Sequence, residues 1–552
     1  MITKLPILSL LLCIVAGCGQ SEQNSNIPNQ TPLTNSSTTN SSINHMKVQT
    51  YQGWLKGSNS TLKPNISVFK GIPYAAPPTG DARWLPPRSA QPWQGERDAT
   101  KFGAACPQPT NFDQFVWSRD DFTINEDCLY LNVWSDLEVE NKPVMVWFHG
   151  GAHTAGKGHD AIFDGSALAD KGVVLVTVNY RLGVLGFLAH PWLTEESDQN
   201  ASGNYGLLDK IVALNWVRDN IAQFGGNPDN VTIFGQSAGS QSVCSLMVSP
   251  LAQGLFHKVI GQSASCLNPQ PQKDQNGIER GQQLAQSLDA KNLQDLRRAS
   301  PAALMQAAET SGWANRSRIT VDGWVVPESP DLLFAQQKQS KVPVLIGSLA
   351  NEGNQLFPLN ANLSRDELNT AVLRLIGETH LDEALKLYKQ DLSQSPGLAL
   401  REISTDLFMA YGMRRWAQHQ SAIGQPAYLY FMDHNPPAFR LYNPGKPDLS
   451  LTGGPRSAGA YHSGDLAYVF GTTHHVGHDW QEDDHELSDN IMSYWTNFAK
   501  QSDPNGSELP RWDKYSAENN ETLLIQTVKQ GTAQTVNGVR SAKLNLFEKA
   551  LN

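Results

Sequence analysis

A strand-like run that leads straight into a Gly-x-Ser-x-Gly turn, and then into a helical pattern, limits the folds open to this chain. Residues 231–234 (VTIF) are apolar or β-branched, and residues 235–239 (GQSAG) follow at once. The two glycines remove side chains that would collide in a sharp strand-to-helix turn. Such a turn exposes the Ser237 oxygen beside the N–H groups of a helix N-terminus. The motif predicts a nucleophilic serine at a strand end; a purely structural turn is the alternative.

Further runs of β-branched and apolar residues predict a sheet with helices between its strands. Near-continuous apolar strands are typical of parallel sheets buried on both faces. Residues 207–224 have helical spacing and end at 225–228 (GGNP), and Ile491, Trp495 and Phe498 mark a later helix. This alternation predicts an α/β fold: one large domain around a mostly parallel sheet. The predicted strands are 144–148, 173–180, 231–234, 259–261, 342–346 and 427–432.

The N-terminus has the pattern of an export signal. Lys4 is followed by the apolar run 5–17, which is too short for a comfortable transmembrane helix. Residues 15–18 (VAGC) resemble a bacterial lipobox, so cleavage would leave Cys18 as a lipidated N-terminus. An ordinary secretory signal with an incidental cysteine is the alternative. Gly19 after the cysteine, by resemblance to lipoproteins, favours the outer membrane over inner-membrane retention.

The next segment predicts a tether. Residues 19–45 are almost all Asn, Ser, Thr, Gln and Pro, which bury too little apolar surface to order the backbone. We therefore divide the chain into a signal peptide at 1–17, a lipidated cysteine with a tether at 18–45, and one folded domain at 46–552. The expected location is the outer membrane of a bacterium, on its periplasmic face or at the cell surface.

The cysteine content of the chain indicates its redox compartment, and its net charge limits the partners that it can bind. Four cysteines follow the tether, an even number in an oxidising compartment. Pairing between neighbours in sequence gives Cys106–Cys128 and Cys244–Cys266; four buried thiols are the alternative. The formal net charge of −10 excludes the basic footprint of a nucleic-acid-binding protein.

Longer motifs carry a family resemblance. The elbow at 234–239 (FGQSAG) resembles that of type-B carboxylesterases, the cholinesterase-like branch of the α/β-hydrolases, and bacterial para-nitrobenzyl-type esterases are the nearest in pattern. The resemblance spans residues 47–547 and implies an α/β-hydrolase fold. The other matching segments, in family order, are 69–78 (FKGIPYAAPP), 126–132 (EDCLYLN), 179–181 (NYR), 203–209 (GNYGLLD), 224–228 (FGGNP), 494–500 (YWTNFAK) and 503–505 (DPN).

The resemblance implies a catalytic triad. His462, in the segment 459–465 (GAYHSGD), is implied as the base that accepts the Ser237 proton. Glu352, just beyond the predicted strand 342–346, is implied as the carboxylate that orients the base, and the chain order Ser, Glu, His fits this fold. A solvated loop carboxylate is the alternative for Glu352, and Asp465 is a nearby competitor.

An oxyanion hole and a substrate pocket are implied in the same way. The backbone N–H groups of Gly151, Ala152 and Ala238 are implied as the oxyanion donors. His153 stands where the family more often has an aromatic residue, so it either brings a titratable group to the acyl site or fills the same volume. Trp117 lies within the predicted Cys106–Cys128 loop, where a cholinesterase Trp binds cations; core packing is the alternative.

The implied function is that of a serine carboxylesterase that acts on small-molecule esters through an acyl-enzyme on Ser237. No cofactor and no metal are implied. The histidine-rich stretch near residues 474–485 is interpreted as a solvated loop rather than a metal site. A lipase, thioesterase or amidase with the same triad is the main alternative, and a non-catalytic cholinesterase-like binding module is a further one.

Overall fold

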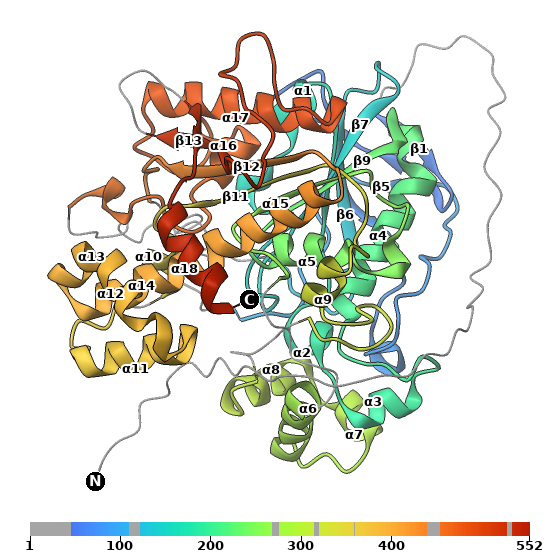
Figure 1. Cartoon of the computed structure of the whole chain (residues 1–552). Helices are drawn as coiled ribbons and strands as arrows, with labels where there is room; N and C mark the ends of the chain where they lie inside the picture. Colours follow the sequence, from blue (N-terminus) through green and yellow to red (C-terminus); the bar gives the residue numbers. More distant parts are fainter. Residues whose placement is uncertain are drawn as a thin grey trace. The chain divides into compact units, whose positions relative to one another are not determined.

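An eleven-stranded sheet organises the part of the chain that the computed structural model describes, residues 46–109, 122–267, 275–313, 319–357, 359–438, 453–526 and 533–551 (Figure 1). Strands β13 to β8 in the sheet order run parallel to one another, and the outer strands pair antiparallel. In sheet order the strands are β14 (Ala533–Asn537), β13 (Glu521–Gln526), β12 (Ala427–Asp433), β11 (Val344–Leu349), β10 (Lys258–Gln262), β9 (Gly226–Gln236), β7 (Lys142–Phe148), β8 (Val174–Val178), β6 (Tyr130–Ser135), β4 (Ser67–Pro73) and β3 (Ser58–Asn59).

Alternate side chains of the buried strands pack into two helical layers. On β7, Val144, Val146 and Phe148 join one hydrophobic core, while Met145 and Trp147 join the other. The first core is covered by α2 (Gly183–Phe187), α3 (Pro191–Glu196), α4 (Tyr205–Asn220), α5 (Ala238–Leu246), α6 (Gln275–Ser287), α7 (Leu293–Arg298), α8 (Pro301–Thr310), α9 (Pro330–Ala335) and α15 (Gly412–Ala422). The second is covered by α1 (Ser166–Asp170), α11 (Arg365–Ile376), α12 (Leu381–Leu387), α14 (Pro396–Thr405), α16 (Leu466–Phe470), α17 (Glu482–Gln501) and α18 (Ser541–Leu551).

The predicted α/β fold with a mostly parallel sheet is confirmed, with shifted element ends. All six predicted strands form, and the predicted helix at 207–224 is α4 followed by a 3-10 turn, Ile221–Phe224. Gly225 has a φ of 74°, which ends that turn. Strand β9 starts at Gly226, earlier than its apolar run, because Lys142 of β7 pairs with Gly226 before a register shift.

Smaller elements complete the described chain. A second sheet joins β1 (Lys47–Thr50), β2 (Gly53–Lys56) and β5 (Glu96–Asp98), and a π-helical segment, Asp406–Tyr411, links α14 to α15. Short helices α10 (Gly353–Leu356) and α13 (Lys389–Gln394) lie between the longer ones. Both predicted disulfides, Cys106–Cys128 and Cys244–Cys266, are present.

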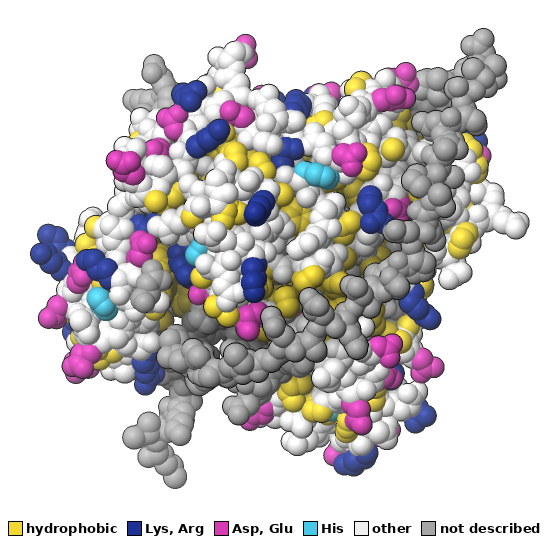
Figure 2. Space-filling model, turned by 45° about the vertical axis from the view of Figure 1, so that its right-hand side comes forward, with side chains coloured by type: hydrophobic (Ala, Val, Ile, Leu, Met, Phe, Trp, Pro, Cys, Tyr) yellow, Lys and Arg dark blue, Asp and Glu magenta, His cyan; other side chains and the backbone are white. Residues whose placement is uncertain are grey.

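The surface carries mixed charge. Acidic and basic side chains are interspersed over the face drawn in Figure 2, which fits the absence of a basic footprint in the sequence. Among the described residues, no helix has both the length and the apolar character of a membrane span. The predicted signal peptide, Cys18 and the tether all lie outside the described residues.

Candidate active site

Ser237 lies on the sharp turn between β9 and α5 that the motif predicts. Its φ of 56° and ψ of −124° are unusual for a residue with a side chain. A Cβ on Gly235 would lie 2.5 Å from the Gly239 carbonyl carbon, and a Cβ on Gly239 would overlap the Phe148 carbonyl oxygen. Only glycines fit at both positions, so the turn keeps the serine at the carboxyl end of the parallel strands.

His462 and Glu352 meet at this same end of the sheet. Glu352 follows β11 and His462 precedes α16, and the imidazole Nδ1 is hydrogen-bonded to Glu352 Oε2. The other carboxylate oxygen accepts the Leu349 N–H at 2.8 Å, and both side chains are buried. Since a carboxylate accepts, the bonding proton lies on Nδ1 and leaves a lone pair on Nε2. Glu352 is therefore not a solvated loop carboxylate.

Asp465 has other partners than the imidazole. Its Oδ2 accepts hydrogen bonds from Gln262 Nε2 at 2.7 Å and from the Tyr430 hydroxyl at 3.1 Å. Desolvation raises the pKa of Asp465 to about 6, and the nearby charge of Glu352 acts in the same direction. The structure thus puts Glu352, not its competitor, on the His462 imidazole.

Gln236 is a residue of the site that the sequence did not single out. It is the last residue of β9, and its Nε2 lies 3.1 Å from His462 Nε2. In the described part of the chain, no hydrogen bond joins the Ser237 hydroxyl to His462. Such bonds are often long in the absence of substrate, so the missing contact does not argue against Ser237. The only sequence signal for Gln236 was its place directly before the serine.

The predicted oxyanion donors are free of protein acceptors. Gly151 and Ala152 have φ values of 103° and 54°, and Ala238 is the first residue of α5. Within the described residues, none of these three N–H groups donates to a protein acceptor. The Gly183 N–H donates to the His153 carbonyl at 2.6 Å and fixes the end of the segment. The three donors are available to a substrate oxygen.

His153 is buried beside this segment. The residue is 2% exposed, its Nε2 lies 2.8 Å from Gln241 Oε1, and its ring packs on Phe187 with centroids 4.8 Å apart. Desolvation, together with the charge of Lys210, lowers the pKa of His153 to about 3. The expected titratable group beside the acyl site therefore stays neutral at working pH, and contact of His153 with substrate stays a prediction. Trp117, the other predicted pocket residue, lies outside the described residues.

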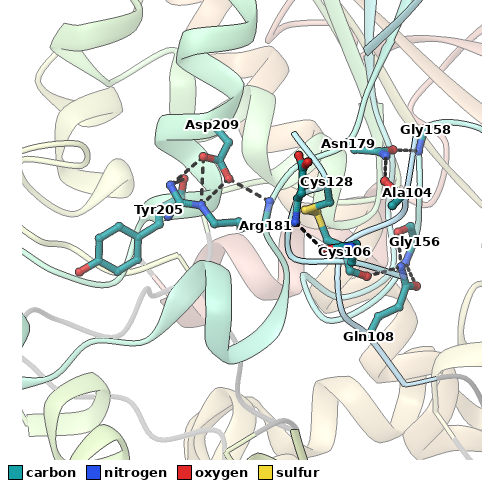
Figure 3. Close-up of a disulfide and its surroundings, with 12 residues drawn as sticks. Ala104, Cys106, Gln108, Cys128, Gly156, Gly158, Asn179, Arg181, Tyr205 and Asp209 are labelled. Atoms are coloured by element: carbon teal, nitrogen blue, oxygen red, sulfur yellow. Dashed lines mark hydrogen bonds and ion pairs between the residues drawn. A yellow bond between two sulfur atoms is a disulfide. The ribbon is translucent and has the colours of Figure 1, made fainter. Parts of the chain in front are cut away.

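The chain beside the first disulfide is hydrogen-bonded to Gly156 and Gly158, a few residues after the predicted oxyanion donors (Figure 3). The Gln108 amide donates to the Cys106 carbonyl at 3.0 Å and to the Gly156 carbonyl at 2.9 Å, and its oxygen accepts the Gly156 N–H at 2.9 Å. Asn179 makes a second link, from the Ala104 carbonyl to the Gly158 N–H. The described residues around Cys106 thus support Gly156 and Gly158.

The histidine-rich stretch forms no metal centre in the described structure. His474 stacks on His485 with centroids 3.7 Å apart, and His478 pairs with Asp479. Over the described ranges, no three His, Cys, Asp or Glu side chains are placed to hold an ion.

Comparison with known proteins decides the family. The model of the carboxylesterase family matches residues 44–547. The chain belongs to the carboxylesterase family. It is 33% identical to the para-nitrobenzyl esterase of Bacillus subtilis, over 88% of this chain and 96% of that enzyme. A fumonisin B1 esterase of Sphingopyxis macrogoltabida is 40% identical over 54% of this chain and 55% of its own length.

Solved carboxylesterase structures are similar to this chain in fold as well as in sequence. A para-nitrobenzyl esterase structure superposes with a TM-score of 0.77 at 32% identity, covering 91% of this chain and 99% of its own. A carboxylesterase from Geobacillus stearothermophilus gives a TM-score of 0.76 at 30% identity, covering 91% of this chain and all of its own. The protein is therefore a carboxylic ester hydrolase with an α/β-hydrolase fold.

Proposed function

We propose that this carboxylesterase works through an acyl-enzyme on Ser237, with His462 as the base and Glu352 as its orienting carboxylate. The observation that carries the proposal is the buried Glu352–His462 pair at the strand ends where the elbow presents Ser237. The Ser237 hydroxyl gives its proton to His462 Nε2 as its oxygen bonds to the acyl carbon. The substrate oxygen becomes negative beside the three free N–H groups.

The second half of the cycle regenerates the enzyme. The imidazolium gives its proton to the departing alcohol oxygen, and the ester bond breaks. A water molecule then gives a proton to His462 and attacks the acyl carbon, which releases the acid and returns the proton to Ser237.

Activity on para-nitrophenyl esters of increasing chain length tests this proposal. Ser237→Ala should lose at least about 10⁴ in kcat, because a nucleophile cannot be spared. Ser245→Ala is the matched control, since Ser245 lies in α5, the helix that follows Ser237, and its hydroxyl donates to the Gln241 carbonyl. More than about a tenth of wild-type activity in Ser237→Ala would exclude Ser237 as the nucleophile.

The same panel separates the substrate classes. An esterase prefers dissolved short-chain esters, whereas a lipase gains activity at a lipid–water interface. Thioesters and amides test the remaining hydrolase alternatives, and a folded chain inactive on every substrate would favour a binding module. Fumonisin B1 belongs in the panel because one relative is named for its hydrolysis.

We further propose that the enzyme is an exported lipoprotein, anchored to the outer membrane through Cys18. The support is the VAGC sequence at 15–18 and the polar stretch at 19–45, which would carry the domain clear of the lipid. Cys18→Ser should release active enzyme from membranes, and Cys13→Ser, inside the signal, is the control. A membrane-bound Cys18→Ser variant, or an unlipidated wild-type N-terminus, would contradict the anchor.

A further inference from the structure

The side chain of Gln236 lies between the base and the oxyanion segment. Gln236 is fully buried, and its Nε2 is 3.1 Å from His462 Nε2. On the opposite side, its Oε1 occupies the space beside Gly150, where a Cβ would be only 2.8 Å away. Within the described residues this Oε1 has no hydrogen-bond partner. The amide is thus held against the base by packing and directed by a single hydrogen bond.

That hydrogen bond occupies the nitrogen that catalysis needs. Because Glu352 holds the proton on Nδ1, Nε2 carries the lone pair, and the Gln236 N–H donates to it. The Ser237 hydroxyl must donate to the same lone pair before it can be deprotonated. Gln236 and Ser237 therefore compete for one acceptor.

We propose that Gln236 is a positioning residue that holds His462 as the neutral base in the resting enzyme and yields Nε2 to Ser237 when substrate binds. The Gln236 N–H stabilises the neutral imidazole, whose Nε2 accepts it. In the imidazolium Nε2 also carries a proton, so two N–H donors would face each other. Gln236 therefore keeps the base in its working form toward acid pH. This inference rests on the proposed Ser237–His462 mechanism and adds to it the pH range of the enzyme.

Few other groups compete for this role among the described residues. Glu352 lies on Nδ1 after β11, and Asp465 lies three residues beyond the base. The hydroxyl of Tyr430, on β12, donates to Asp465 at 3.1 Å. In the described structure Asp465 and Tyr430 are bonded to each other and not to His462, so only Gln236 is bonded to Nε2 there.

The pH profile of kcat/KM on para-nitrophenyl acetate tests the proposal. Gln236→Met removes the donor and should move the acid limb to higher pH by about half a unit to one unit, the size of one neutral hydrogen bond. Gln236→Glu replaces the donor by a carboxylate and should move the limb by at least about one unit. At pH 6 this lowers kcat/KM, relative to its plateau, by up to about tenfold.

Gln420→Met is the matched control. Gln420 is also fully buried, and its side-chain amide donates to the Ser340 and Val342 carbonyls, so its loss should reduce stability without moving the limb. Acid limbs of both Gln236 variants within 0.3 unit of wild type, in protein that melts cooperatively, would overturn the proposal. Ser237→Ala distinguishes failure of the proposed mechanism from failure of the role of Gln236. An active Ser237→Ala would show that the mechanism is wrong. If Ser237→Ala is inactive and the acid limbs of the Gln236 variants do not move, only the role of Gln236 is refuted.

A crystal structure of the unliganded wild type covers the case in which the Gln236 variants do not fold. The proposal expects the Gln236 amide within about 3.3 Å of His462 Nε2, with the Ser237 hydroxyl farther away. A Ser237 hydroxyl within hydrogen-bonding distance of Nε2 and a Gln236 amide turned away from it would overturn the proposal.

Discussion

Replacement of Glu352 by glutamine tests how the carboxylate controls the base. Both carboxylate oxygens are used: one binds His462 Nδ1, and the other accepts the Leu349 N–H at 2.8 Å. In Glu352→Gln the amide oxygen can satisfy only one of these donors. If it stays on Leu349, the new NH₂ group faces His462 and drives the ring proton from Nδ1 to Nε2, which can then no longer accept the Ser237 proton.

The opposite orientation of the new amide is unfavourable. It would set the NH₂ group against the Leu349 N–H, and a buried donor without an acceptor costs about 1–3 kcal/mol. Most molecules should therefore carry the wrong tautomer. In a serine protease triad, the equivalent change lowers kcat by about 10⁴, or about 5.5 kcal/mol of transition-state stabilisation.

We expect Glu352→Gln to lower kcat on para-nitrophenyl acetate by about 10³ to 10⁴, with KM within about threefold. The loss should be smaller than that of Ser237→Ala, because the nucleophile stays in place. Glu402→Gln, a change at another buried glutamate outside the site, should keep kcat within about threefold. A loss of less than tenfold in Glu352→Gln would refute the role assigned to Glu352.

Three further predictions concern stability and His153. Removal of the Cys244–Cys266 disulfide, whose cysteines are 22 residues apart, should lower the free energy of unfolding by about 3 kcal/mol in urea titrations, and a loss below about 1 kcal/mol would contradict the loop-entropy estimate. Burial lowers the pKa of Lys210 well below its usual value, so the unfolded chain binds a proton there that the folded chain does not. The free energy of unfolding should therefore rise with pH, by about 1.4 kcal/mol per unit between that lowered pKa and about 10.4. Lys210→Met should remove this slope in urea titrations at several pH values. An unchanged slope in Lys210→Met would contradict the prediction. Because the pKa of His153 is about 3, His153→Phe should leave the acid limb of kcat/KM unmoved while shifting ester preference toward apolar acyl groups, and a moved limb would show that His153 titrates in the working range.

The sequence predicted the parts of the fold that depend on local pattern. The buried parallel strands are nearly continuous apolar runs, so β7, β8 and β12 were found close to their true ends. Strand β9 was predicted too short because its first residues are polar, and only pairing with β7 makes them a strand. The π-helical segment Asp406–Tyr411 has no comparable signal in the sequence.

The sequence indicates candidate site residues where a motif fixes them, and it gives no sign of contacts between distant residues. Ser237, Glu352 and His462 lie in recognisable segments, and the structure brings the last two into contact. Gln236 and His462 are 226 residues apart, so their contact cannot be read from either segment alone. Lys210 is a further surprise, because lysine is usually exposed, yet this one is fully buried against the Tyr180 ring.

Covalent labelling of the nucleophile is the most direct test of the central claim. A phosphonate that mimics the tetrahedral intermediate should react once per chain and end activity, since it captures the activated serine. Peptide mass spectrometry should find the adduct on Ser237 in the wild type and on no residue in Ser237→Ala. An adduct on another residue, or full inhibition with Ser237 unmodified, would contradict catalysis through Ser237.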